Sequence, residues 1–255
     1  LAVDSIDSFS EALLISMSGC GVGFSVEGRY VEKLPRIIRQ SGDNTETFII
    51  PDTTEGWVDA LRRGMSVWFE GGDIKFDYSL IRSAGAILKI KGGRASGPEP
   101  LKQMLEFTKS RILVRQGSFL RAIDAHDIMC MVGQAAVSGG VRRTAMISLF
   151  DWDDYEMRLS KSGDFEGDNW QMWNANNSVV IPDRGLTQSE FVRLMLDMFG
   201  SERGEPGIFN RPGAVKFRPE RRKPAEFGSN PCGEINLRPF ELCNLTIAIA
   251  RPSDS

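Results

Sequence analysis

The feature that most constrains the fold is an alternation of short apolar segments with helical patterns along the 255 residues. Segments typical of β-strands are expected at 22–26, 47–50, 87–91, 145–150 and 177–181. Between them, apolar residues recur at three- to four-residue spacing in segments that start near residues 8, 52, 98, 124 and 187. Strands that alternate with amphipathic helices favour an α/β fold with a mainly parallel sheet.

Polar residues ahead of the apolar patterns predict where helices begin. Ser8 with Glu11, and Thr187 with Glu190, have the spacing of a capping box, in which each residue satisfies a backbone N–H near the other. Asp52 is expected to begin a further helix, which lies between these two helices in the sequence. The segment 202–230, rich in Gly, Pro, Arg and Lys, is expected to be irregular.

Charge and residue counts exclude several classes of protein. The chain has 31 Lys and Arg against 34 Asp and Glu. It therefore lacks the excess of basic residues that proteins use to bind polymeric nucleic acid, and such a partner is not expected. No apolar run reaches the ~18 residues of a membrane span, and the first 25 residues lack a basic signal region, so a cytoplasmic protein is expected. A single histidine and four cysteines without a C-x-x-C pair predict no metal site and no disulfide scaffold.

The densest group of reactive side chains lies within five consecutive residues. Pro231 and Gly233 flank Cys232, which suits a tight turn that projects a thiol. Asn230 can donate and accept hydrogen bonds, and Glu234 can act as a base. The group is therefore a candidate active site, although a turn around a small buried cysteine is the alternative interpretation.

This string, with Cys243-Asn-Leu-Thr246 eleven residues after Cys232, resembles the active-site loop of ribonucleotide reductases. Its spacing is most similar to that of the adenosylcobalamin-dependent, monomeric ribonucleoside-triphosphate reductases. Segments similar to other blocks of that family occur in the same order at 4–13, 21–26, 76–82, 92–98, 139–143 and 174–179. The resemblance implies an α/β barrel of ten strands in two halves. Residues 1–255 would be a fragment holding the first half, in which 202–230 leads to a finger loop at 230–243.

The same resemblance implies roles for single residues. Cys232 would carry the thiyl radical that abstracts the substrate 3′ hydrogen, Glu234 would remove the 3′-hydroxyl proton, and Asn230 would bind the ribose hydroxyls. Cys243 would be one of two cysteines that supply reducing equivalents. The resemblance also implies adenosylcobalamin as cofactor, a ribonucleoside triphosphate as substrate, a deoxynucleotide as effector, and thioredoxin or a similar reductant.

Weaker candidates for contacts with substrate or effector are Gly92, Gly93, Arg94, Ser96, Arg142, Arg143, Asn176, Asn177 and Ser178. The first four lie in a glycine-rich segment that resembles the family's effector-reading loop. The arginine pair could bind phosphates through guanidinium forks, and the Asn-Asn-Ser run offers neutral hydrogen-bonding groups. A plain connector, solvated arginines and ordinary turn chemistry are the respective alternatives.

Three other interpretations of the function stay open. The chain could belong to a reductase that receives its radical from a separate metal-containing subunit. It could be a nucleotide-binding fragment without catalysis, because half a barrel leaves sheet edges unpaired. It could also be a thiol redox protein that uses Cys232 and Cys243, although their separation is unlike a C-x-x-C motif.

The remaining cysteines and the histidine have no catalytic role in this interpretation. The family's second reducing cysteine should precede the first helix, and residues 1–10 contain none, so it is expected outside the chain together with the C-terminal cysteine pair. Cys20 is expected to pack beside a glycine turn and Cys130 in an apolar helix. His126 is expected to lie on a helix face.

Overall fold

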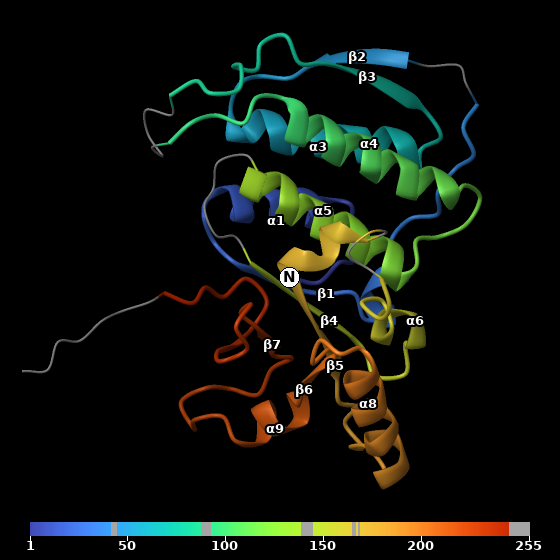
Figure 1. The fold of residues 1–255 in the computed structure, drawn as a ribbon, viewed down its shortest axis with the longest axis vertical. Helices are drawn as coiled ribbons and strands as arrows, with labels where there is room; N and C mark the ends of the chain where they lie inside the picture. Colours follow the sequence, from blue (N-terminus) through green and yellow to red (C-terminus); the bar gives the residue numbers. More distant parts are fainter. Residues whose placement is uncertain (42–44, 88–92, 139–144, 165–166, 168, 245–255) are drawn as a thin grey trace, which may run out of the picture.

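A four-stranded parallel sheet forms the centre of the molecule (Figure 1). In this computed structural model, the described residues are 1–41, 45–87, 93–138, 145–164, 167 and 169–244. The strands are β1 (Val22–Ser25), β4 (Met146–Asp151), β5 (Ala175–Val180) and β6 (Gly207–Phe209), hydrogen-bonded in the order β1-β4-β5-β6. Every neighbouring pair is parallel, so the predicted α/β fold with parallel strands is confirmed.

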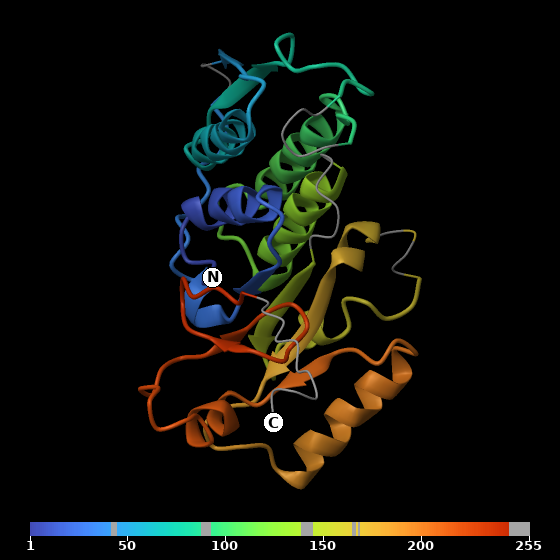
Figure 2. The ribbon, with the colours of Figure 1, turned by 90° about the vertical axis from the view of Figure 1, so that its left-hand side faces the viewer.

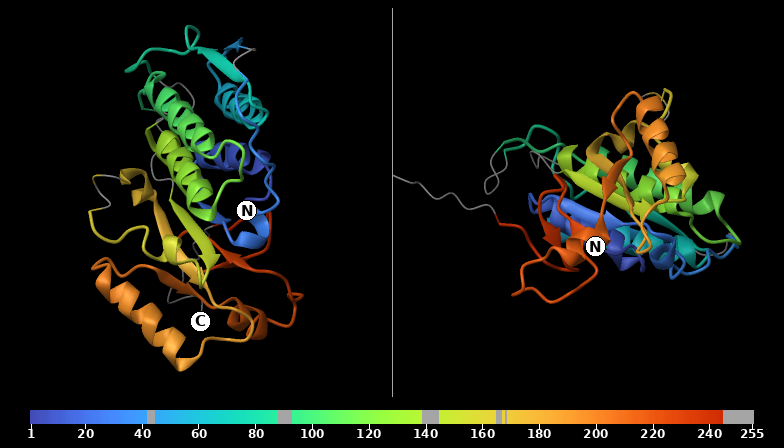
Figure 3. Two further views of the ribbon diagram at one scale, coloured as in Figure 1. Left: turned by 90° about the vertical axis from the view of Figure 1, so that its right-hand side faces the viewer. Right: turned by 90° about the horizontal axis from the view of Figure 1, so that it is seen from below.

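Helices are stacked in layers on one side of this sheet (Figure 3). α1 (Asp7–Met17) and α5 (Ala122–Ser138) contact β1 and β4, and α3 (Thr54–Phe69) and α4 (Glu99–Val114) pack beyond them. A separate parallel pair, β2 (Thr45–Ile49) and β3 (Asp73–Asp77), lies outermost. Shorter elements are α2 (Gly28–Val31), α6 (Tyr155–Arg158) and the 3-10 helix η1 (Trp170–Asn174).

The layers meet in a large apolar core because alternate strand residues point toward the helices. On β1, Val22 and Phe24 face this side, and the Phe24 ring lies 6.0 Å from the ring of His126 on α5. Both His126 and Cys130 are fully buried, which confirms the expectation that Cys130 packs in an apolar helix. Most of the apolar residues of α1 and α5 belong to the same cluster.

The opposite face of the sheet carries a much smaller core. It consists of Ile147, Leu149, Val180, Phe209 and Phe227. The chain after β6 covers this face through α9 (Arg211–Lys216), β7 (Gly228–Ser229) and β8 (Asn236–Leu237) (Figure 2). α8 (Gln188–Gly200) lies at the same end of the molecule, after β5 (Figure 1).

Two of the predicted helix starts are corrected by the structure. The capping box at Ser8 is wrong, because α1 begins at Asp7 without a side-chain cap and the Ser8 hydroxyl donates to the Ala2 carbonyl, 2.9 Å away. Thr53 rather than Asp52 caps α3, since its hydroxyl accepts a hydrogen bond from the Gly56 N–H. Thr53 has the extended backbone conformation that an N-cap requires, whereas Ile6, the residue before α1, has a helical backbone and no side chain that could cap.

The second predicted capping box is confirmed at the start of α8. The Thr187 hydroxyl accepts from the Glu190 N–H at 3.3 Å, and the Glu190 carboxylate accepts from the Thr187 N–H at 2.8 Å. Two backbone N–H groups at the start of α8 that have no partner within the helix thereby gain hydrogen bonds.

The segment 202–230 is only partly irregular. It contains β6, which pairs with β5, and α9, whose first turn is capped by the Asn210 side chain accepting from the Gly213 N–H at 2.9 Å. A three-residue strand and a six-residue helix are too short to give a periodic apolar signal. Most of the strand expected at 87–91 lies outside the described residues.

Among the helices of the described residues, none combines the length and the apolar content that a membrane crossing requires.

Candidate active site

The predicted reactive residues lie on the turn that joins β7 to β8. These strands are antiparallel, with Gly228 opposite Leu237 and Ser229 opposite Asn236. Within the turn, the Gly233 N–H donates to the Asn230 carbonyl at 3.0 Å, and Gly233 has φ +83°, a left-handed conformation that glycine adopts without strain. Cys232, just before this glycine, is an exposed free thiol.

Asn230 connects the two ends of this turn. Its amide nitrogen donates to Oε1 of Glu234 at 2.8 Å, and its amide oxygen accepts from the Ile235 N–H at 3.1 Å. The carboxylate is therefore oriented by the amide next to it, and both lie within two residues of the Cys232 thiol. The turn presents a nucleophile or radical carrier, a base and a hydrogen-bonding amide together on the surface.

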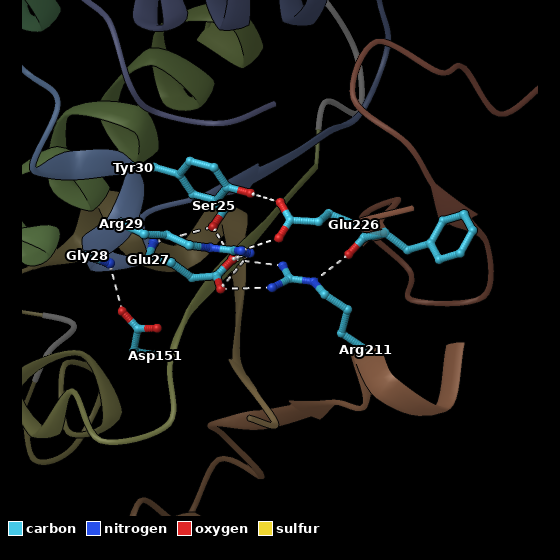
Figure 4. A network of polar contacts seen from close by, with 9 residues as sticks. Ser25, Glu27, Gly28, Arg29, Tyr30, Asp151, Arg211 and Glu226 are labelled. Atoms are coloured by element: carbon cyan, nitrogen blue, oxygen red, sulfur yellow. Dashed lines mark hydrogen bonds and ion pairs between the residues drawn. The ribbon is translucent and has the colours of Figure 1, made fainter. Parts of the chain in front are cut away.

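A second polar network fixes the chain segment that leads into the turn (Figure 4). Glu27, two residues after the end of β1, accepts from Nη1 and Nη2 of Arg211 at 2.8 and 2.7 Å and from the Ser25 hydroxyl at 2.7 Å. Nε of Arg211 donates to the Phe227 carbonyl at 2.8 Å. Burial by itself would raise the pKa of Glu27, but the hydrogen bonds and charge of Arg211 outweigh it and the pKa is lowered.

The same network includes three neighbours of Glu27. Glu226 contacts Arg29 and accepts from the Tyr30 hydroxyl at 2.8 Å, while the Gly28 N–H donates to Asp151 at 2.7 Å. Burial, followed by the hydrogen bond to Glu226, raises the pKa of Tyr30 to about 12. Sequence reasoning missed this network, because Glu27 and Arg211 are 184 positions apart and no local motif marks either residue.

Comparisons with known proteins agree on one family. Residues 28–112 match the family model described as the insertion domain of B12-dependent ribonucleotide reductase. The chain is 31% identical over 257 residues to the adenosylcobalamin-dependent ribonucleoside-triphosphate reductase of Euglena gracilis, covering 96% of this chain and 34% of that protein. For the enzyme of the same name from Lacticaseibacillus paracasei, the identity is 33% over 273 residues, covering 90% of this chain and 36% of that protein.

A solved structure shows the same likeness in three dimensions. The crystal structure of a B12-dependent, class II ribonucleotide reductase superposes with a TM-score of 0.76 at 29% identity, over 90% of this chain and 36% of that one. Over 90% or more of its own length, the chain is thus similar to B12-dependent ribonucleotide reductases. It spans about a third of the length of these relatives.

The family model also explains the outer layers of the fold. Residues 28–112 contain α2, β2, α3, β3 and nearly all of α4, and they lie between β1 and α5 in the chain. Apart from α2, whose Arg29 and Tyr30 contact Glu226, the matched segment forms the layers beyond α1 and α5, away from the central sheet (Figures 1 and 3). The sequence patterns did not separate it from the rest, because its helices and strands alternate as those of the main sheet do.

The Asn-Asn-Ser run lies on β5, and its members face different sides. Asn176 is exposed, and its amide nitrogen donates to the Pro231 carbonyl at 2.7 Å, beside Cys232. Asn177 is buried and donates to the Ser160 hydroxyl at 3.0 Å. Ser178 is also buried. The period of two in a strand thus turns Asn177 away from the reactive turn.

The other predicted residues lie apart from the turn or outside the described residues. Cys243 is half-buried, and none of the four cysteines, all of which lie in the described part of the chain, forms a disulfide. Arg94 donates to the Gly85 carbonyl at 3.0 Å and Ser96 to the Gly97 carbonyl at 3.2 Å, so both contact their own loop. Gly93 has φ +85°. Gly92, Arg142 and Arg143 lie outside the described residues.

Proposed function

We propose that this chain carries the radical-bearing part of a catalytic barrel that reduces ribonucleoside triphosphates to 2′-deoxyribonucleoside triphosphates for DNA synthesis. The observation that carries the proposal is the turn at 230–234, where an exposed Cys232 thiol follows an Asn230 that orients the Glu234 carboxylate. Supporting it, the relatives from Euglena gracilis and Lacticaseibacillus paracasei bear the name of this reaction.

In the proposed reaction, Cys232 as a thiyl radical takes the hydrogen atom from C3′, so that an S–H bond forms and the carbon becomes the radical. Glu234 accepts the 3′-hydroxyl proton while one of the two reducing thiols protonates the 2′-hydroxyl, which leaves as water. Two thiols, one of them on Cys243, supply two electrons and end as a disulfide. Cys232 finally returns its hydrogen atom to C3′ and is a thiyl radical again.

The geometry of the turn suits these tasks. Asn230 donates to Oε1 of Glu234 at 2.8 Å, which leaves Oε2 to accept the proton in the proposed reaction. The Asn230 amide can meet the ribose hydroxyls when the substrate binds. Exposure of Cys232 leaves room for a nucleotide at its sulfur.

Adenosylcobalamin is the proposed cofactor, and when bound it supplies the radical that removes the thiol hydrogen of Cys232. The exposed thiol at the tip of a turn is accessible to a group of this size, so the residues present fit it. His126 is fully buried beneath the sheet, and the described residues contain no cluster of three metal-ligating side chains. In this proposal, Cys232 is the residue that would face the cofactor.

Other partners follow from the same proposal. A deoxynucleotide effector and thioredoxin or a similar reductant would serve the enzyme, and a cytoplasmic location suits a reaction that consumes thiol reductants. The weaker candidates for nucleotide contacts, including Gly93, Arg94 and Ser96, stay predictions. So do Arg142 and Arg143.

The test is an anaerobic assay of the protein with a ribonucleoside triphosphate, a dithiol and adenosylcobalamin. We expect Cys232→Ser to abolish deoxynucleotide formation, because an alcohol cannot replace the thiyl radical. Cys20→Ser changes an exposed cysteine that has no role in the proposal and should retain wild-type turnover. Turnover by the Cys232 variant would refute the assignment, and turnover without adenosylcobalamin would favour a separate radical-generating subunit.

A further inference from the structure

The reactive turn lies unusually close to the sheet beneath it. A Cβ atom on Gly23 of β1 would come within 1.9 Å of the Ser229 carbonyl oxygen, and one on Gly21 within 2.6 Å of the Pro231 ring. No side chain fits at Gly23 without a shift of backbone, since the atom it would meet belongs to the main chain. The two glycines therefore let residues 229–231 rest directly on β1.

Asn176 meets the same segment from β5, two strands away from β1 on the same face of the sheet. Its amide nitrogen donates to the Pro231 carbonyl at 2.7 Å, and this carbonyl belongs to the peptide bond that leads into Cys232. In the ladder, Gly23 pairs with Ile147 and Ile147 pairs with Asn176. This row of residues crosses three strands. At the β1 end, Gly23 leaves space for the Ser229 carbonyl, and at the β5 end, Asn176 donates a hydrogen bond to the Pro231 carbonyl.

We propose that Asn176 and Gly23 are positioning residues for the radical-bearing thiol, with Asn176 acting on the protein loop rather than on a nucleotide. The contact of Asn176 with Pro231 fixes the height of the turn above β5, and the missing side chain of Gly23 fixes its distance from β1. Together they determine where Cys232 lies over the sheet. The role of the thiol rests on the proposed function, whereas the position of the loop does not.

The start of the same segment is held independently. Arg211 binds the Phe227 carbonyl at 2.8 Å and is itself held by the buried Glu27 carboxylate. Ser229 follows two residues later and is also buried. Loss of the Asn176 contact should therefore release the tip of the turn while the base of the hairpin stays in place.

Hydrogen–deuterium exchange tests this arrangement without any need for turnover. In the protein with Asn176→Asp, the side chain keeps its size but loses the donor and places a carboxylate oxygen against the Pro231 carbonyl. We expect exchange in peptides that cover 228–237 to rise about tenfold, the equivalent of one hydrogen bond, while peptides of β4 keep the wild-type rate. Asn176→Gln retains a donor and should lie closer to wild type. Unchanged exchange in the Asp variant, or equal acceleration in both variants, would overturn the proposal.

Two glycine-to-alanine variants, one on β1 and one on the hairpin that packs against it, form a matched pair. Gly23→Ala should accelerate exchange in 228–237, because its Cβ meets the Ser229 carbonyl. Gly228→Ala adds the same group to the hairpin itself, where the nearest atom is a Leu149 methyl at 3.7 Å, and should have little effect. Equal exchange in the two variants would contradict the role of Gly23. Should Gly23→Ala fail to fold, the Asn176 variants still decide the proposal.

Kinetics of deoxynucleotide formation then separate positioning from substrate binding. A positioning role predicts that Asn176→Asp lowers kcat at least tenfold with little change in KM, and that Asn176→Gln recovers part of the loss. A raised KM with unchanged kcat would make Asn176 a substrate contact and overturn the inference. If the wild-type protein makes no deoxynucleotide, the proposed function fails, and the exchange experiment alone decides whether these residues position the loop.

Discussion

The two faces of the central sheet are stabilised in different ways. Toward the helices, the sheet contributes to one continuous apolar cluster that includes residues of α1, α3, α4 and α5. Toward the reactive turn, five of the residues that the structure describes form a small buried apolar core, and much of the contact is made by main chain and by polar groups. The first arrangement supplies stability, and the second supplies a defined position for Cys232.

Strand β1 shows the difference within two consecutive residues. Phe24 fills the helix-covered face and is 1% exposed, whereas Gly23 leaves the opposite face open for the Ser229 carbonyl. A hydrophobic core tolerates swaps of similar volume, but a main-chain contact across a glycine tolerates no added atom. We therefore expect changes on the two faces to differ in kind as well as in size.

The largest effect on stability is expected from Phe24→Ala. The variant removes a buried aromatic side chain from the helix-covered core, which typically costs about 3–5 kcal/mol of unfolding free energy. Urea denaturation followed by circular dichroism measures the loss. A loss below about 1 kcal/mol would show that the helix-covered core does not depend on β1, and would weaken the contrast between the faces.

A smaller loss is expected on the other face from Glu27→Gln. The variant leaves Arg211 in a mostly buried position without its counter-charge, and breaking such a pair costs about 3 kcal/mol. Exchange in peptides covering 226–229 should rise with it, because Arg211 also holds the Phe227 carbonyl. The control is Glu46→Gln, which breaks an exposed ion pair with Arg63 and should leave the denaturation midpoint unchanged. Equal effects of both variants would contradict the role of burial.

The smallest effect is a difference in how the two faces respond to acid. On the helix side, burial raises the pKa of Asp127 to about 6, although Arg111 opposes the shift, so the folded state takes up a proton before the unfolded state does. This carboxyl therefore adds stability as the pH falls from about 6 toward its ordinary value of 3.8. Glu27 on the turn side has a lowered pKa, so its contribution is present above its ordinary value of 4.5 and is lost as the pH falls below it.

Comparison of the wild type with Asp127→Asn isolates the first of these two effects. The stability advantage of the wild type should grow by about 1.4 kcal/mol per pH unit between pH 6 and 4, measured by denaturant titration at each pH. The lower stability of Glu27→Gln relative to the wild type should instead disappear only as the pH falls below about 4.5. An advantage of the wild type over Asp127→Asn that is independent of pH would show that Asp127 titrates normally.

Much of the candidate site could be read from the sequence because it is local. Asn230, Cys232 and Glu234 fall within five residues, and the structure adds that the asparagine hydrogen-bonds to the glutamate. The residue types in the Asn-Asn-Ser run were also visible, but the sequence did not show that Asn176 and Asn177 face opposite sides of β5. Their different partners follow from strand geometry and from which chain segment lies against each face.

By itself, the sequence determined the alternation of strands and helices, the parallel α/β class, the capping box at Thr187 and the reactive string at 230–234. These depend on spacings of a few residues, over which side-chain periodicity and local hydrogen bonds act. Only the tertiary structure decided that Glu27 binds Arg211 and that Gly23 and Asn176 support the turn. Those contacts join residues from 55 to 206 positions apart, and no local pattern specifies them because they form only when the sheet brings distant strands into one row.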